Sequence, residues 1–179
     1  GIATFSQDLR TALINKFSKS FSLRVCALEA EQEKHAYPPE VKYVLDTSDV
    51  QCYEDISNVI NIDNRVKLVL LQHEFGFFGA VAEKDFLRFL TRIKKPLVIA
   101  FHTVLSNPDA ALKNKVSNIT LACNSIVVMT NDAAQILHNE YYVPLEKITV
   151  IGHGVHLVPH LSKTQLKEKY GFTGRKVLS

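Results

Sequence analysis

A short, unbroken apolar run at residues 68–71 is the clearest feature of the chain, and it ends abruptly in the polar residues Gln72, His73 and Glu74. An apolar run without alternation predicts a strand that is covered on both faces, as in a parallel sheet. Polar groups directly after such a strand lie at the edge where open α/β sheets bind their ligands. We therefore interpret residues 68–71 as a central strand with a functional edge.

The rest of the chain repeats this alternation of strand and helix. The pattern predicts an α/β fold, with a doubly wound, mostly parallel Rossmann-like sheet and helices on both faces. Apolar segments predict strands at residues 21–28, 41–45, 68–71, 97–101, 125–129 and 148–151. Apolar side chains at helical spacing predict helices at residues 4–19, 50–61, 83–94, 110–122, 133–142 and 162–170.

The start of the first helix is predicted by Thr4, because Gln7 follows it at the spacing of a capping box. Residues 1–3 would then form the loop before that helix. Free N–H groups and the helix dipole favour a phosphate at such a place, which makes Gly1 and Ile2 candidate binding residues. A plain strand-to-helix turn is the alternative interpretation.

Composition narrows the class of protein. The chain has 179 residues, of which 46% are hydrophobic and 22% charged, and its net charge is +3. No basic stripe with interleaved aromatic residues is present, so we expect no nucleic-acid partner. The odd number and wide spacing of Cys26, Cys52 and Cys123 favour free thiols in a reducing compartment. No apolar run reaches the ~18 residues of a spanning helix and no signal peptide is visible, so we expect a cytoplasmic protein.

The residues at both ends of the sequence indicate that this chain is a piece of a larger protein. The sequence begins at Gly1 without a methionine, and residues 175–179 resemble the first residues of another strand. We interpret residues 1–160 as one Rossmann-like domain that is truncated before Gly1. Residues 161–179 would form a linker helix, capped by Ser162 with Gln165 and ended by Gly171, and the start of a missing domain.

Candidate functional residues follow several of the predicted strands. His73, His102, Thr130 and His153 would all lie at the same edge of a parallel sheet and line one crevice. Three histidines could hold a metal, but strand-end histidines more often bond substrate or backbone, so we expect no metal site. His73 and Glu74 do not begin an HExxH motif, because Phe77 stands at the second histidine position.

Glycine patterns disfavour several nucleotide-binding and hydrolase classes. No GxGxxG follows a predicted strand, and neither GxxxxGK[ST] nor GxSxG occurs. Gly76 and Gly79 are either turn glycines or positions that let a ligand approach the backbone closely.

Five blocks together resemble the amino-terminal domain of a GT-B fold glycosyltransferase of the retaining family 4 type, also called glycosyl transferase group 1. The blocks are GIATF, QHEFGFFG, IAFHT, IVVMTN and VIGHGVH, and LKEKYGFTGRKVLS is similar to the segment with which these enzymes enter their second domain. The resemblance implies one half of a GT-B fold, in which two Rossmann-like domains face a cleft. The amino-terminal domain holds the acceptor, and the carboxyl-terminal domain holds the nucleotide-sugar.

The resemblance also implies roles for individual residues. His102 matches the histidine at the reacting centre and is the expected catalytic residue. Gly1 matches the glycine that approaches the donor phosphates, whereas His73 and Glu74 match the acceptor side of the cleft. The expected substrate-binding residues are Gly1, Ile2, His73, Glu74, Gly76, Thr103, Thr130 and Asn131.

The implied activity is transfer of a sugar, with retention, from a nucleotide-sugar to a hydroxyl acceptor such as a glycan, a lipid-linked sugar or a small molecule. The family requires no metal and no cofactor. Peripheral association with the inner face of the membrane is common in the family, although no basic helix here demands it. The chain departs from the family where His153-Gly-Val-His156 replaces Asn-Gly-Val-Asp. Since the nucleotide-sugar domain is missing, we expect this chain alone to be inactive.

Two other functions stay open. The same crevice suits a non-enzymatic Rossmann-like module that binds a ligand or partner. A weaker alternative is a sugar-phosphate hydrolase or epimerase that uses His102 as acid and base.

The resemblance further implies a strand before Gly1 in the middle of the sheet. Without that strand, backbone groups and apolar edges would be exposed. We expect the slot to be filled by a preceding segment or, in a homo-oligomer, by residues 175–179 of a neighbouring chain.

Overall fold

The computed structural model describes residues 1–29, 35–77, 82–154 and 161–177. Its helices are α1 (Ile2–Phe17), α2 (Val50–Ile62), α3 (Ala82–Arg92), α4 (Ala110–Ala122), α5 (Asn131–Tyr141) and α6 (Lys163–Lys169). Its strands are β1 (Val25–Glu29), β2 (Val41–Asp46), β3 (Val69–His73), β4 (Leu97–Phe101), β5 (Ser125–Val128) and β6 (Ile148–Val150). Short 3₁₀ helices lie at Ser18–Ser20, Phe75–Phe77 and Leu145–Lys147. Gly79, His156 and the end of the strand expected at residues 175–179 lie outside the described residues.

All strand pairs are parallel, which confirms the predicted α/β, Rossmann-like class. The strands form a four-stranded sheet in the order β3-β4-β5-β6 and a separate two-stranded sheet of β1 and β2. Within the described residues, no backbone hydrogen bond joins β1 to β3. The sheet is therefore divided between β1 and β3, and each of these strands has one free edge.

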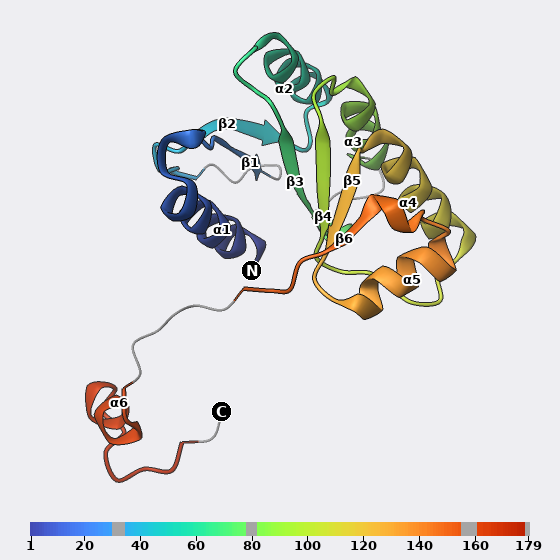
Figure 1. The fold of residues 1–179 in the computed structure, drawn as a ribbon. Helices are drawn as coiled ribbons and strands as arrows, with labels where there is room; N and C mark the ends of the chain where they lie inside the picture. Colours follow the sequence, from blue (N-terminus) through green and yellow to red (C-terminus); the bar gives the residue numbers. More distant parts are fainter. Residues whose placement is uncertain (30–34, 78–81, 155–160, 178–179) are drawn as a thin grey trace.

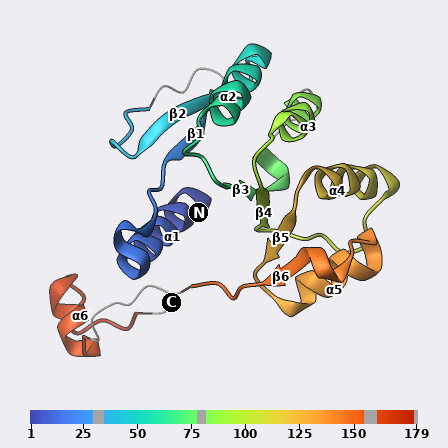
Figure 2. The ribbon, with the colours of Figure 1, turned by 45° about the horizontal axis from the view of Figure 1, so that its top comes forward.

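Four helices form a continuous layer against the strands. α2 packs against α3, α3 against α4, and α4 against α5. α1 lies on the other side of the four-stranded sheet, as Figures 1 and 2 show. This is the helix placement of a doubly wound fold, because right-handed crossovers put the helices of oppositely progressing strands on opposite faces.

The core lies between the four-stranded sheet and the layer of α2 to α5. Side chains that are at most 1% exposed come from strands and from helices alike, because each helix buries one apolar stripe. The largest of these apolar side chains are Phe86, Leu90, Leu97, Ile99, Phe101, Ile119, Ile126 and Leu137. α1 contributes no buried residue, so the opposite face of the sheet is less completely covered.

The prediction of a strand covered on both faces at residues 68–71 was wrong. Leu68 lies before β3 and is 54% exposed, and Leu70 is 41% exposed. β3 is an edge strand of its sheet. The apolar run therefore predicted the strand correctly but not its surroundings.

The predicted start of α1 was also wrong. The helix begins at Ile2 with Gly1 as N-cap, and no side chain caps it. The Phe5 N–H bonds to the Gly1 carbonyl at 3.0 Å, so Thr4 lies inside the first turn and cannot act as a cap. Ile2 is helical rather than part of a loop. The amino end of the helix is thus at Gly1 itself.

The strand predicted at residues 21–28 begins later, at Val25. Its pairing with β2 starts at Val25 and Val41, so residues 21–24 have no parallel partner to hold them in a ladder. β2 pairs only with β1 and is an edge strand of the two-stranded sheet.

The residues predicted to begin and end the last helix, α6, are confirmed. Ser162 and Gln165 form a reciprocal capping box, and Gly171 adopts a φ of 69° just after the helix. Figures 1 and 2 show α6 apart from the sheets, and none of its residues is buried. No helix within the described residues has the length and apolar character needed to cross a membrane.

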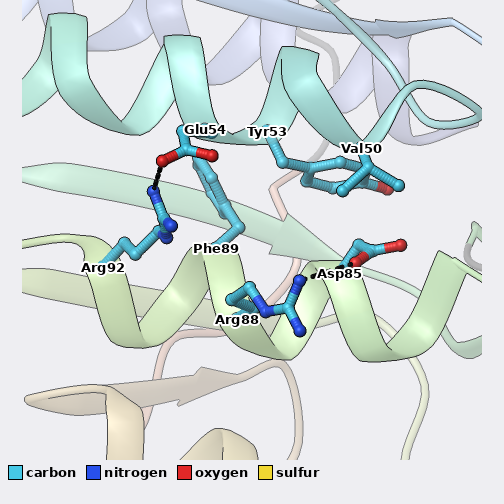
Figure 3. A pocket seen from close by; sticks show the side chains of 7 residues that line it. All are labelled: Val50, Tyr53, Glu54, Asp85, Arg88, Phe89 and Arg92. Atoms are coloured by element: carbon cyan, nitrogen blue, oxygen red, sulfur yellow. Dashed lines mark hydrogen bonds and ion pairs between the residues drawn. The ribbon is translucent and has the colours of Figure 1, made fainter.

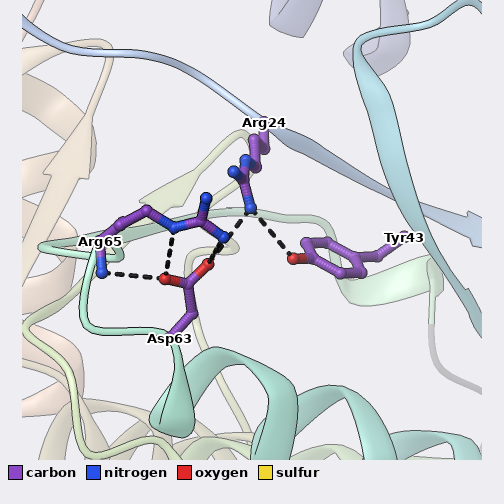
Figure 4. Close-up of polar contacts among 4 residues, drawn as sticks. All are labelled: Arg24, Tyr43, Asp63 and Arg65. Atoms are coloured by element: carbon purple, nitrogen blue, oxygen red, sulfur yellow. Dashed lines mark hydrogen bonds and ion pairs between the residues drawn. The ribbon is translucent and has the colours of Figure 1, made fainter.

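A polar cluster connects the two sheets (Figure 4). Asp63, at the end of α2, accepts hydrogen bonds from the backbone N–H and the guanidinium of Arg65, each at 2.9 Å. Arg24, which precedes β1, reaches the same carboxylate at 3.2 Å and the Tyr43 hydroxyl of β2 at 3.4 Å. These contacts join the segment before β1 to the loop that leads into β3.

Candidate functional site

The carboxyl ends of the four parallel strands meet at one edge, as the strand pattern predicted. The register aligns His73 of β3 with Phe101 of β4, and Phe101 with Val128 of β5. The polar residues that follow these strands therefore start from neighbouring positions. We call this region the strand-end site, formed by Phe5, Gln72, Glu74, His102, Thr103 and His153.

One polar pair in the strand-end site joins the loops after β3 and β4. The Thr103 hydroxyl donates a hydrogen bond of 2.6 Å to Glu74 Oε2. The other oxygen of Glu74, Oε1, accepts the Phe75 backbone N–H at 2.9 Å. The carboxylate is therefore held in one orientation with a side chain and a backbone donor, and each oxygen keeps a further lone pair for a ligand.

A second pair links β3 directly to the end of β4. Nε2 of His102 lies 2.7 Å from Oε1 of Gln72. Burial lowers the pKa of His102, the nearby Glu74 charge raises it, and His153 lowers it, for a net decrease. The imidazole is consequently neutral at pH 7 and can both donate and accept a hydrogen bond.

Phe5 brings α1 to the same site. Its ring meets that of His102 edge-on, at 4.8 Å between centroids, and lies 5.1 Å from the ring of His153. The first turn of α1 thus reaches the carboxyl ends of β4 and β6, as the position of the amino terminus in Figure 1 also shows. This contact places the unpaired N–H groups at the start of α1, and with them Gly1 and Ile2, near His102.

His73 does not share this site. The strand pleat turns it to the opposite face, where it is fully buried against Phe75, Phe86 and Phe101. Neither ring nitrogen has a hydrogen-bond partner among the described residues. Burial lowers the pKa of His73 to about 4, with smaller effects from Lys115 and His102. His73 is therefore a neutral member of the aromatic core, and its ring is not accessible to an acceptor.

Three other predicted residues have local structural roles or open surroundings. The Thr130 hydroxyl caps α5 by accepting the Ala133 N–H at 3.0 Å, and Asn131 is the first residue of that helix. Gly76 is an exposed residue of the 3₁₀ turn Phe75–Phe77, and a Cβ at this position would meet no atom of the described residues within 4 Å. Packing against the described residues therefore does not require glycine at this position.

Gln72 and Phe5 were not predicted as site residues, and His153 was predicted to line the crevice but was not among the expected substrate-binding residues. Gln72 was visible as the first polar residue after the apolar run, and His153 as a strand-end histidine. Phe5 gave no such signal, because it is one of several apolar residues at helical spacing in α1. Only the packing of α1 against the strand ends identifies it.

The hollows on the helical layer are separate from the strand-end site. One lies between α2 and α3 and has a volume of about 20 Å³, which is close to the space of a single water. Figure 3 shows the ion pair of Glu54 and Arg92, at 2.5 Å, across it. An open hollow of about 450 Å³ lies between α3 and α4, and it is lined by Leu87, Arg88, Thr91, Asn118, Leu121 and Ala122. No residue of the strand-end site lines either hollow.

Among the residues with described positions, no group of three or more His, Cys, Asp or Glu side chains is arranged to hold a metal ion. Cys26, Cys52 and Cys123 are all free. Comparisons of the chain with protein-family models, with curated proteins and with solved structures gave no match.

Proposed function

We propose that this chain is the acceptor-binding half of a retaining glycosyltransferase that moves a sugar from a nucleotide-sugar to a hydroxyl acceptor. The observation that carries the proposal is the pairing of Gln72 with His102 and of Glu74 with Thr103 at the carboxyl edge of a parallel sheet. This edge is where open α/β sheets bind ligands. A few fixed polar groups beside an aromatic ring, here Phe5, suit a polyhydroxylated ligand.

Each residue has a distinct part in the proposed reaction. His102, as a neutral imidazole, contacts the transferred sugar, and Glu74 accepts a hydrogen bond from an acceptor hydroxyl. The amino end of α1 offers its free N–H groups and its dipole to the donor phosphates near Gly1. These groups would stabilise the charge that develops on the leaving diphosphate.

The chemical step itself needs little from the protein. The bond between the anomeric carbon and the diphosphate oxygen breaks, and a bond from the acceptor oxygen to the same face of that carbon forms. The acceptor proton passes to the departing phosphate oxygen. This transfer of the sugar and the proton requires neither a metal nor a side-chain base. The chain would therefore mainly position substrates and stabilise charge.

Most donor contacts in this proposal come from a second Rossmann-like domain. The 179-residue chain should therefore bind an acceptor without turning over a nucleotide-sugar. Detectable transfer by the purified chain alone would contradict this part of the proposal.

A non-enzymatic binding module is the second candidate. It is favoured by the fact that the polar groups of the strand-end site already pair with one another, His102 with Gln72 and Glu74 with Thr103. Such a prearranged site can recognise a ligand without chemistry. Turnover by the two-domain protein separates the two candidates.

The test is a transfer and hydrolysis screen of uridine-, guanosine- and adenosine-diphosphate sugars with the two-domain enzyme that the proposal requires. His102→Ala is compared with His138→Ala, which removes another half-buried imidazole from the last turn of α5. We expect turnover that is lost in His102→Ala and kept in His138→Ala. Turnover unaffected by His102→Ala would remove His102 from the reacting centre, and absence of turnover with every donor would favour the binding module.

A further inference from the structure

Gln72 lies in β3, and His102 directly follows the adjacent parallel strand β4. The register pairs Gln72 with Ala100. His102 comes two residues after Ala100, so its side chain points to the same face of the sheet as those of Ala100 and Gln72. His73, between Gln72 and Glu74, points to the opposite side, into the core. The contact of 2.7 Å between Gln72 Oε1 and His102 Nε2 is thus set by the backbone register.

This contact determines how the neutral imidazole carries its hydrogen. The amide oxygen of a glutamine can only accept a hydrogen bond, so Nε2 of His102 must be the donor. A neutral imidazole has one N–H and one lone pair, and the hydrogen on Nε2 leaves Nδ1 as an acceptor. No hydrogen-bond partner of Nδ1 is present in the described part of the chain.

We propose that Gln72 is a positioning residue that holds His102 as the Nε2–H tautomer and leaves Nδ1 to accept a hydrogen bond from a hydroxyl of the bound sugar or acceptor. The assignment of the ligand hydroxyl rests on the proposed function. The assignment of the tautomer rests on the geometry of the two side chains alone.

The surroundings of His102 support this role. The Phe5 ring meets the imidazole at an interplanar angle of 87° and restricts its rotation from the side of α1. The titratable groups that act on the imidazole are Glu74, from the loop after β3, and His153, from the segment after β6. Burial has the largest effect on the pKa of His102 and lowers it, which keeps the ring neutral at pH 7.

The test measures the tautomer of His102 directly, by long-range ¹H–¹⁵N correlation spectra of the ¹⁵N-histidine-labelled 179-residue chain at pH 7. The chain has seven histidines, and loss of one signal in His102→Gln assigns the resonance. The variants are Gln72→Leu, which removes the acceptor, and Gln72→Glu, which keeps it and adds a charge. Gln51→Leu is the control, because Gln51 lies on the exposed side of α2 and bonds to Asp55.

We expect the Nε2–H pattern in the unmodified chain and in the control, and a mixture of both tautomers in Gln72→Leu. Gln72→Glu should retain Nε2–H and raise the pKa of His102 by about one unit, because a carboxylate favours the imidazolium. A purely structural role for Gln72 would leave the tautomer unchanged. The Nδ1–H pattern in the unmodified chain would overturn the inference, and this measurement does not depend on whether a variant folds. An unchanged tautomer in Gln72→Leu would also overturn it.

A second set of spectra tests the ligand. Addition of uridine diphosphate glucose or of methyl glucoside and methyl mannoside should shift the Nδ1 resonance of His102. Binding that shifts other resonances and leaves Nδ1 unchanged would overturn the ligand assignment. Failure of the proposed function is distinguishable, because then no donor or acceptor shifts any resonance, whereas the tautomer measurement still decides the role of Gln72.

Discussion

The Thr103 hydroxyl donates a 2.6 Å hydrogen bond to the Glu74 carboxylate and so couples the loops that follow β3 and β4. These two residues are 29 positions apart in the chain, and only the parallel pairing of the two strands brings them together. A substitution of Glu74 can therefore test whether the strand-end site binds a ligand.

Glu74→Gln keeps the size of the side chain and removes its charge. Under the proposed function, we expect the affinity for a hydroxyl acceptor to fall about tenfold, because hydrogen bonds to a charged acceptor are about twice as strong as neutral ones. Titration calorimetry or chemical-shift titration with glycosides measures the change. Glu146→Gln, at an exposed position of the turn before β6, is the matched control and should bind normally. Equal affinity in both variants would remove Glu74 from the binding site.

His73 should make the stability of the protein depend on pH. Its pKa is lowered to about 4 in the folded chain from an ordinary value of 6.5, so the unfolded chain takes up the proton more readily. The free energy of unfolding is therefore not reduced by His73 above pH 6.5, and it falls as the pH is lowered from 6.5 toward 4. The decline from this group should reach roughly 2 kcal/mol between pH 7 and pH 5.

The comparison for this prediction is His73→Phe, which keeps an aromatic ring among Phe75, Phe86 and Phe101. We expect urea unfolding at pH 7 and pH 5 to show a much smaller difference for the variant than for the unmodified chain. If both proteins lose the same free energy of unfolding, the histidine is not the source of the acid sensitivity.

The free edges of β1 and β3 should be visible in hydrogen exchange. The Val69 N–H bonds to Pro96, beside β4, and successive residues of a parallel strand point their N–H groups alternately to either side. The N–H groups of Leu70 and Gln72 therefore point away from β4, toward the free edge. By NMR, we expect them to exchange on the order of 100-fold faster than the N–H of Ile99, which lies in a strand with two neighbours. Equal protection of Leu70 and Ile99 would show that the edge of β3 is covered in solution.

Thr130 offers a test that separates capping from binding. Thr130→Ala removes the side-chain cap of α5 and should lower the free energy of unfolding by about 1 kcal/mol, whereas Thr130→Ser should restore most of it. Denaturant unfolding of the three proteins measures this. Because the hydroxyl is already engaged by the Ala133 N–H, we expect little change in ligand affinity. A large loss of affinity with normal stability would instead support the substrate-binding role that the sequence blocks suggested.

The cluster around Asp63 should contribute to stability only above acidic pH. Hydrogen bonds from Arg65, and then the charges of Arg65 and Arg24, hold the pKa of the Asp63 carboxyl well below its usual range. A lowered carboxyl pKa stabilises the fold above the ordinary value near 4, and this stability is lost as the pH falls below it. We expect the melting temperature of Asp63→Asn to be lower than that of the unmodified chain at pH 7, and the difference to shrink as the pH falls below 4. A constant difference across this range would contradict the electrostatic explanation.

Local patterns in the sequence determined most of the secondary structure. Apolar runs and helical spacing located six strands and six helices, and the Ser162 box and Gly171 correctly placed the ends of α6, because these signals act over a few neighbouring residues. The alternation of strand and helix also predicted that the polar residues after β3 and β4 would meet at one edge. That inference needs only the parallel direction of the strands.

Tertiary structure decided what each of these residues contacts. The sequence placed His73 and Glu74 together at the edge, but the pleat sends His73 into the aromatic core and leaves Glu74 with Thr103. It also suggested that β3 is covered on both faces, whereas the division of the sheet leaves Leu70 partly exposed. The physical reason is that burial and hydrogen bonding depend on neighbours that are distant in sequence, and the contact of Gln72 with His102 exists only because the register of β3 and β4 aligns them.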